Sequence, residues 1–194
     1  YTVTITDANS CSQTAEVTLT VKILPTATGA TQTVCSGDDA VLTVDVEGAI
    51  NPTYRWSDAN NSTGSSATIP NVTSANHNEV YTVTVTAGVG CEVTAEVPLK
   101  VRAAPDSRIL AQPASICEGK STTLVAKTPA LKRHYEWSTG HSGGLFSNPQ
   151  GFLINVSTGG VYALTVTNTK TGCTSASTVL IEEVARPLPT ITSP

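Results

Sequence analysis

The sequence predicts an all-β protein built from β-sandwich domains arranged head to tail, and two observations lead to this prediction. The first is an internal repeat with a period of about 80 residues, which is within the range of tandem domain arrays. The second is an alternation of apolar and polar side chains with a period of two, broken by turn residues between the alternating runs. We find no stretch with the period of 3.6 residues that is typical of an amphipathic helix.

Three landmarks recur in one order and at nearly one spacing. The segments YTVTITDANSC, YTVTVTAGVGC and YALTVTNTKTGC begin at Tyr1, Tyr81 and Tyr162. The segments TVCSGDDAVLTV and SICEGKSTTLVA contain Cys35 and Cys117, whose separation in the chain is almost that of successive tyrosines in this set. The tryptophans of YRWS and YEWS are separated by almost the same interval. Chance does not produce such agreement, so the chain is a tandem repeat.

The period predicts the domain boundaries. We expect residues 1–24 to be the C-terminal strands of a repeat whose beginning is missing, so that the chain is an internal piece of a longer mature protein. Residues 25–103 and 104–185 are expected to be full repeats, and 186–194 to begin another, because RPLPTITSP is similar to ILPTATGAT. The junctions are short, so consecutive domains should be closely coupled.

Within the first full repeat, Val83 and Val85 share a face with Tyr81, while Thr82 and Thr84 take the other face. This alternation with β-branched residues is typical of half-buried strands. About seven short strands in roughly 80 residues describe an immunoglobulin-like sandwich. We expect five strands near 26–34, 40–46, 53–57, 79–86 and 91–101, and two more within 66–73.

Aromatic residues are only 5% of the chain, and four of them recur at the repeat spacing. We predict that these four are central core residues: Trp56, Tyr81, Trp137 and Tyr162. Burying one such side chain stabilises the fold by about 2–3 kcal/mol, which is a large share of the stability of a small sandwich. A role in stacking on sugars would require exposed rings.

The VCSGDDAVLTV segment, the YRWS strand and the YTVTITDANSC hairpin together resemble the PKD-like and immunoglobulin-like repeats of secreted Bacteroidetes surface proteins. These proteins include gliding-motility adhesins and products of type IX secretion. The resemblance covers essentially the whole chain and implies an extracellular, cell-surface location. The chain departs from a PKD domain because WSDAN and WSTGH replace W-x-F-G-D-G, and from antibody domains because the strands 40–46 and 79–86 carry no Cys.

The cysteines fall into two classes. Cys35 and Cys117 precede the strand 40–46 and its counterpart in the next repeat, whereas Cys11, Cys91 and Cys173 follow the turn after each YTVTVT-like strand. An extracellular location favours disulfides. No C-x-x-C pair is present, so we predict no zinc site.

Two ways of pairing the cysteines are open. Within repeats, Cys35 would join Cys91 and Cys117 would join Cys173 at equal separations in the sequence, leaving Cys11 alone. In an immunoglobulin-like sandwich, however, a strand of roughly 30 Å separates the two corners, whereas disulfide partners need Cα atoms within about 7 Å. The alternative between repeats joins Cys35 to Cys173, and we favour it. Cys91 and Cys117 would then have partners outside this chain.

The remaining motifs predict no catalytic residue, no metal and no cofactor. Residues 140–144 match G-x-S-x-G, but they follow a strand where the first repeat has a turn, so we interpret them as a turn. The net charge of −4 argues against nucleic acid as a partner. No apolar run approaches the roughly 20 residues that cross a bilayer.

These observations lead to three functional hypotheses, none of them enzymatic. The first is a structural repeat of an extracellular adhesin stalk or surface filament, stiffened by disulfides. The others are a module that binds a glycan or protein, and an appendage of a secreted hydrolase. The partners expected under the first hypothesis are neighbouring repeats of the same chain or identical subunits, and the second adds a surface glycan or protein.

Overall fold

A computed structural model of the chain describes residues 1–22, 24–88, 90–144 and 151–187. These residues form strands β1 to β17 and one 3-10 helix, η1 (Ser74–Asn76), which confirms the predicted all-β fold class. The chain divides into two compact units. The first comprises Tyr1–Gln32, Val41–Ile69 and Glu79–Pro98, and the second comprises Thr33–Ala40, Pro70–Asn78 and Leu99–Pro194. The predicted repeat boundaries stay a prediction, and residues 188–194 of the predicted last repeat lie outside the described residues.

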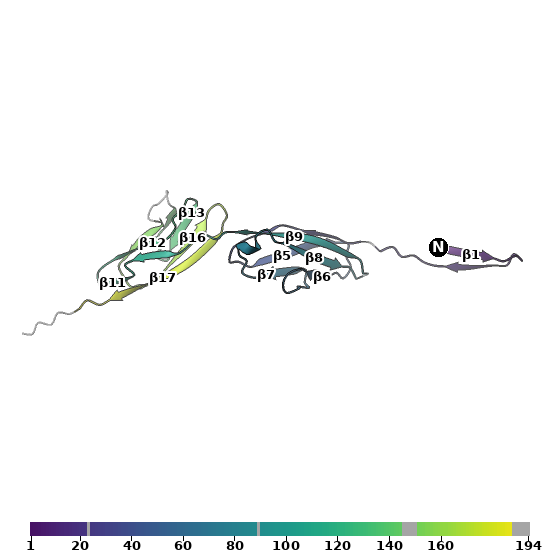
Figure 1. Ribbon diagram of the computed structural model, residues 1–194, viewed down its shortest axis with the longest axis horizontal. Coiled ribbons are helices and arrows are strands. Elements are labelled where there is room, and N and C mark those ends of the chain that lie inside the picture. Colours follow the sequence, from purple (N-terminus) through teal and green to yellow (C-terminus); the bar gives the residue numbers. More distant parts are fainter. Residues whose placement is uncertain (23, 89, 145–150, 188–194) are drawn as a thin grey trace, which may run out of the picture. The chain divides into compact units, whose positions relative to one another are not determined.

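The strands between residues 26 and 102 form two sheets (Figure 1). One has the order β3-β5-β7, with β3 (Thr26–Gly29), β5 (Ala40–Glu47) and β7 (Ser66–Ile69). The other has the order β4-β9-β8-β6, with β4 (Gln32–Cys35), β9 (Glu92–Arg102), β8 (Val80–Thr86) and β6 (Thr53–Trp56). Their facing side chains form a core of Leu42, Trp56, Ala67, Val83, Val85, Ala95 and Val97.

Two details of the predicted strands are wrong. The strand expected at 26–34 is broken, and its halves β3 and β4 belong to different sheets. Only β7 forms within 66–73 in place of two strands. After β7 comes Pro70, which has no N–H to donate, and the N–H groups of Asn71 and Val72 donate to the side chain of Asp39 and the carbonyl of Asp38. These bonds tie the chain to a corner, so no further strand forms.

The strands between residues 109 and 184 repeat this sheet order. One sheet is β10-β12-β15, with β10 (Ile109–Gln112), β12 (Thr122–Ala126) and β15 (Leu153–Val156). The other is β11-β17-β16-β13-β14, with β11 (Ser115–Cys117), β17 (Thr174–Val184), β16 (Gly160–Asn168), β13 (Arg133–Trp137) and β14 (Ser142–Gly144). β11 runs parallel to β17, whereas β16 is antiparallel to both β13 and β17. This topology is that of an immunoglobulin-like sandwich with an added edge strand, β14.

The two tryptophans are buried in the same way in both sandwiches. Trp56 is 1% exposed and Trp137 is 2% exposed. The indole N–H of Trp56 donates to the carbonyl of Gly64 (2.9 Å), and that of Trp137 donates to the carbonyl of Gly151 (3.0 Å). Each ring thus fills the core while its one polar atom is satisfied by a neighbouring loop.

The two tyrosines predicted for the core differ. Tyr162 is buried, and its hydroxyl donates to the carbonyl of Thr158 four residues upstream, as in the tyrosine corner of immunoglobulin-like domains. Tyr81 is only half-buried at the margin of its core, and its hydroxyl donates to the carboxylate of Glu79. A carboxylate two residues away keeps that hydroxyl near solvent, which the repeat spacing did not predict.

The hairpin of β1 (Thr2–Thr6) and β2 (Ser12–Glu16) has the sequence pattern of β8 and β9 but a different environment. Val83 and Val85 are fully buried, whereas their equivalents Val3 and Ile5 are 58% and 71% exposed. The same alternation therefore gives a strand pair in both places, but a core forms only where a second sheet covers the apolar face.

This difference gives a matched test of the core. We expect Val83→Ala to lower the free energy of unfolding by about 2 kcal/mol, because it leaves a cavity between the sheets. Val3→Ala, at the equivalent position, should change it by less than about 0.5 kcal/mol, because the side chain is exposed. Urea denaturation followed by circular dichroism measures both, and equal losses would contradict the assignment of Val83 to the core.

Candidate functional site: the Cys35–Cys173 disulfide

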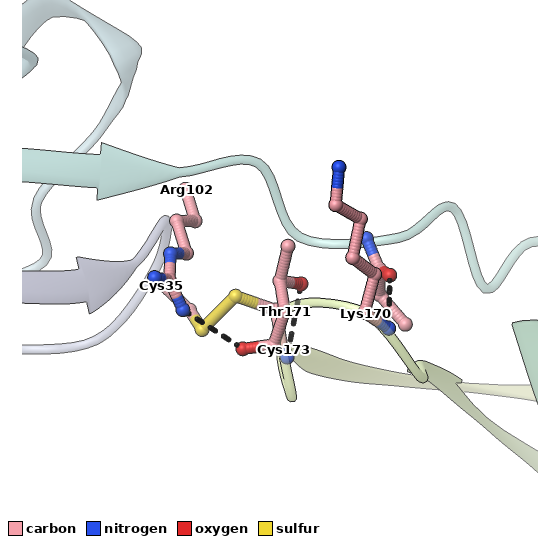
Figure 2. Close-up of a disulfide and its surroundings, with 6 residues drawn as sticks. Cys35, Arg102, Lys170, Thr171 and Cys173 are labelled. Carbon is pink, nitrogen blue, oxygen red and sulfur yellow. Dashed lines mark hydrogen bonds between the residues drawn. A yellow bond between two sulfur atoms is a disulfide. The ribbon is translucent and has the colours of Figure 1, made fainter. Parts of the chain in front are cut away.

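The described residues contain one disulfide, between Cys35 at the end of β4 and Cys173 directly before β17 (Figure 2). The two residues are 138 positions apart in the sequence, and their Cα atoms are 5.6 Å apart. Cys173 is fully buried and Cys35 is half-buried. Both belong to the second compact unit.

Cys35 is held at a tight corner between β4 and β5. The N–H of Asp38 donates to the carbonyl of Cys35 (3.1 Å), which closes a turn over Gly37. Gly37 has φ of +99°, a conformation that side chains of L-residues rarely adopt. The N–H of Gly37 also donates to the carbonyl of the buried Val72 (2.8 Å). The backbone that follows Cys35 is thus fixed in the corner.

Cys173 is held in the same manner by the turn between β16 and β17. Its carbonyl accepts from the N–H of Asn168 (2.8 Å), and the N–H of Gly172 donates to the carbonyl of Asn168 (2.8 Å). Gly172 has φ of +77°. The turn therefore fixes the backbone position of Cys173.

Arg102, at the end of β9, links both sides of the disulfide. Its carbonyl accepts from the N–H of Ser36 (2.8 Å), next to Cys35. Its guanidinium donates to the carbonyl of Thr171 (3.2 Å), two residues before Cys173, as Figure 2 shows. One residue thus bonds to both segments that the disulfide joins. Sequence reasoning missed this role and had no signal for it, because only the fold brings the three segments together.

The segment between β9 and β10 is attached to β17. The hydroxyl of Ser175 donates to the carbonyl of Pro105 (2.5 Å), and that of Ser177 donates to the carbonyl of Ser107. Pro105 and Ser107 are both buried. These bonds hold the segment along β17, so it is not a free linker.

Asp106 forms a second set of bonds in this segment. Its carboxylate accepts two bonds from the guanidinium of Arg108 (2.8 and 2.7 Å) and one from the hydroxyl of Thr128. The bonds from the Arg108 side chain, followed by that from Thr128, hold the pKa of the Asp106 carboxyl well below its usual value. The charged form of Asp106 therefore favours the folded state.

This lowered pKa predicts a pH dependence of stability. Because the pKa in the folded state lies below the unfolded value of 3.8, the stabilisation is fully present above that pH and is lost as the pH falls towards the folded value. We expect Asp106→Asn to cost about 1 kcal/mol at pH 7 and to weaken the loss of stability on acidification.

Thermal unfolding between pH 7 and pH 2 measures this difference. Asp45→Asn, which alters an exposed carboxylate on β5, is the control and should follow the unmodified chain. An Asp106→Asn profile with the same slope as that of the unmodified chain would contradict the role of the ion pair.

The other cysteines are not bonded. Cys11 and Cys117 are exposed free thiols, and Cys91 is a half-buried one. The within-repeat pairing would have joined Cys91 to Cys35 and Cys117 to Cys173. Cys35 and Cys173 are instead joined to each other. Partners for Cys91 and Cys117 outside this chain remain a prediction.

Residues 140–144 lie in a strand-turn-strand hairpin and not in a strand-turn-helix corner. Residues 142–144 form β14, which pairs antiparallel with β13, and the N–H of Trp137 donates to the carbonyl of His141 (2.8 Å). Among the described residues, no group of three or more His, Cys, Asp or Glu side chains could hold a metal ion. The same part of the chain contains no helix that is long and apolar enough to cross a membrane.

Sequence reasoning missed one central core residue. Tyr135 is completely buried beside Trp137, and its hydroxyl accepts from the N–H of Ala130 (2.9 Å). The signal was present, because Tyr135 lies two residues before Trp137 and therefore points to the same face of the strand. Its counterpart Tyr54 is half-buried, so the two repeats use this position differently.

Comparison with known proteins gives matches to solved structures only. No protein-family model matches the chain, and no curated protein matches it. The first eight immunoglobulin domains of Down Syndrome Cell Adhesion Molecule align with 14% identity and a TM-score of 0.48, over 95% of this chain and 30% of that one. Titin domains z1z2, solved in complex with telethonin, align with 18% identity and a TM-score of 0.36, over 87% of this chain and 100% of that one. Murine CEACAM1b aligns with 15% identity and a TM-score of 0.35, over 82% of this chain and 100% of that one.

All three TM-scores are below 0.5, so the assignment of the fold rests on the sheet order and the cores. On these grounds the chain is a tandem array of immunoglobulin-like β-sandwich domains.

Proposed function

We propose that this chain is a non-catalytic structural part of an extracellular stalk or surface filament, of the kind found in the secreted Bacteroidetes adhesins that its sequence resembles. The observation that carries the proposal is the Cys35–Cys173 disulfide, which joins two segments 138 residues apart. The bond keeps the backbone at Cys35 close to the backbone at Cys173. A stalk has to hold its shape, and a covalent bond between distant segments makes the chain stiffer.

Three connections act together around the disulfide, all of them within the second compact unit. The first is the segment 103–108, whose backbone carbonyls accept bonds from Ser175 and Ser177. The second is the disulfide, and the third is the bond from Arg102 to the carbonyl of Thr171. A disulfide typically contributes about 2–4 kcal/mol, and it persists in the oxidising medium outside the cell. The covalent bond is therefore the strongest of the three connections.

The two tryptophans favour a structural role over glycan binding. A sugar site needs rings that are open to solvent, whereas Trp56 and Trp137 are buried and donate their indole N–H groups to loop carbonyls. The partners that this proposal implies are neighbouring repeats of the same chain or identical subunits.

Small-angle X-ray scattering of a Cys35→Ala/Cys173→Ala chain tests the proposed function. Without the disulfide we expect a broader distribution of conformations and a shift in the radius of gyration, while circular dichroism remains that of two folded sandwiches. Cys11→Ala/Cys117→Ala, which removes two exposed free thiols, is the matched control and should scatter like the unmodified chain. Scattering unchanged by loss of the disulfide would refute the stiffening role.

A further inference from the structure

We propose that Cys117 and Cys91 form a second disulfide of the same kind, head to tail between two copies of this chain. The proposal rests on the proposed function, which it deepens by naming the partner. Cys117 belongs to the class of Cys35, and Cys91 belongs to the class of Cys173. The bond between Cys35 and Cys173 shows that a cysteine of the first class can join one of the second class in this type of repeat.

Cys117 lies at the corner of its own repeat that is equivalent to the corner of Cys35. The N–H of Lys120 donates to the carbonyl of Cys117 (2.9 Å), as that of Asp38 donates to Cys35. The N–H of Glu118 donates to the carbonyl of Val184 at the end of β17 (3.0 Å), as that of Ser36 donates to Arg102 at the end of β9. The backbone that holds Cys35 for its partner is thus reproduced around Cys117, whose thiol is exposed.

Cys91 follows a turn at the same place in its repeat as Cys173, although that turn is one residue shorter. The N–H of Ala87 donates to the carbonyl of Cys91 (2.8 Å), the same distance as between Asn168 and Cys173. Gly90 has φ of +82° and Gly172 has φ of +77°, so both turns end in the same conformation. The bonded Cys173 is fully buried, whereas the free Cys91 is half-buried. Cys91 thus occupies the position of Cys173 in its repeat and has no bonded partner.

The link joins two different surfaces, so a dimer formed by one such bond still carries an unused Cys91 and an unused Cys117. Each chain has one free cysteine of the first class, Cys117, and a free Cys91 of the second class on an intact sandwich. In such a dimer, the unused Cys117 of one copy and the unused Cys91 of the other can each bond to a further copy of the chain. Cys11 follows a turn with the same hydrogen bonds as the turn before Cys91. It lies, however, in the β1–β2 hairpin, whose strands are exposed on both faces. We therefore assign the link to Cys91.

The bond forms by two thiol–disulfide exchanges with a small-molecule disulfide such as oxidised glutathione. The thiolate of Cys117 attacks one sulfur of the oxidant, forms a mixed disulfide and releases one glutathione thiolate. The thiolate of Cys91 from the second copy then attacks the Cys117 sulfur and releases the other. Two protons leave the protein thiols, and two electrons reduce the oxidant.

Three variants of the full chain test the proposal in a glutathione redox buffer. Cys11→Ser retains both free thiols, and adding Cys91→Ser or Cys117→Ser retains only one of them. On non-reducing gels we expect the Cys11→Ser chain to give a ladder of dimers, trimers and longer multimers. Each single-thiol chain should lose all multimers when it is alone, and an equal mixture of the two should give dimers and nothing larger.

Peptide mapping by mass spectrometry should find Cys91 linked to Cys117 in every multimer. Dimers formed by either single-thiol chain alone, a Cys11→Ser chain that stays monomeric, or an internal Cys91–Cys117 bond in the monomer would each overturn the proposal. None of these variants alters Cys35 or Cys173, and the same maps report whether that disulfide is intact. Failure here therefore leaves the scattering test of the proposed function unaffected.

Discussion

Each sandwich depends on packing two sheets face to face around a buried tryptophan. Trp56 and Trp137 each lie at the end of a strand, and each donates its indole N–H to the backbone carbonyl of a glycine, Gly64 or Gly151. Because the rings are buried and satisfied, the sheets are held in one register with respect to each other. The corners and turns at the ends of the strands are fixed as a consequence, and those corners carry the cysteines.

The disulfide is an outcome of this positioning. Two glycines with positive φ, Gly37 and Gly172, shape the turns that present Cys35 and Cys173. Arg102 then bonds to the backbone on both sides of the pair. Polar bonds from β17 hold the intervening segment, including its Pro105 carbonyl. Because the backbone sets this geometry, little conformational freedom is lost when the sulfur atoms bond, and this favours a stable disulfide.

The β1–β2 hairpin shows what the cores contribute. Its sequence is that of β8 and β9, and it forms the same antiparallel pairing and the same turn. Val3 and Ile5 nevertheless remain exposed, whereas Val83 and Val85 are completely buried. Local pattern is sufficient for a hairpin, but the stability of a sandwich comes from the covered face.

The strand pattern, the repeat, the all-β fold class and the two classes of cysteine could be predicted from the sequence, because alternation and spacing are local or periodic properties. Other features depend on the fold: the strand near 26–34 divides between two sheets, Tyr135 is more deeply buried than Tyr81, and Arg102 bonds to Thr171. The spacing of the cysteines left two pairings open, and only the geometry of the expected immunoglobulin-like sandwich favoured Cys35 with Cys173. Bonding requires sulfur atoms in contact, and contact between residues 138 positions apart is a property of the folded chain alone.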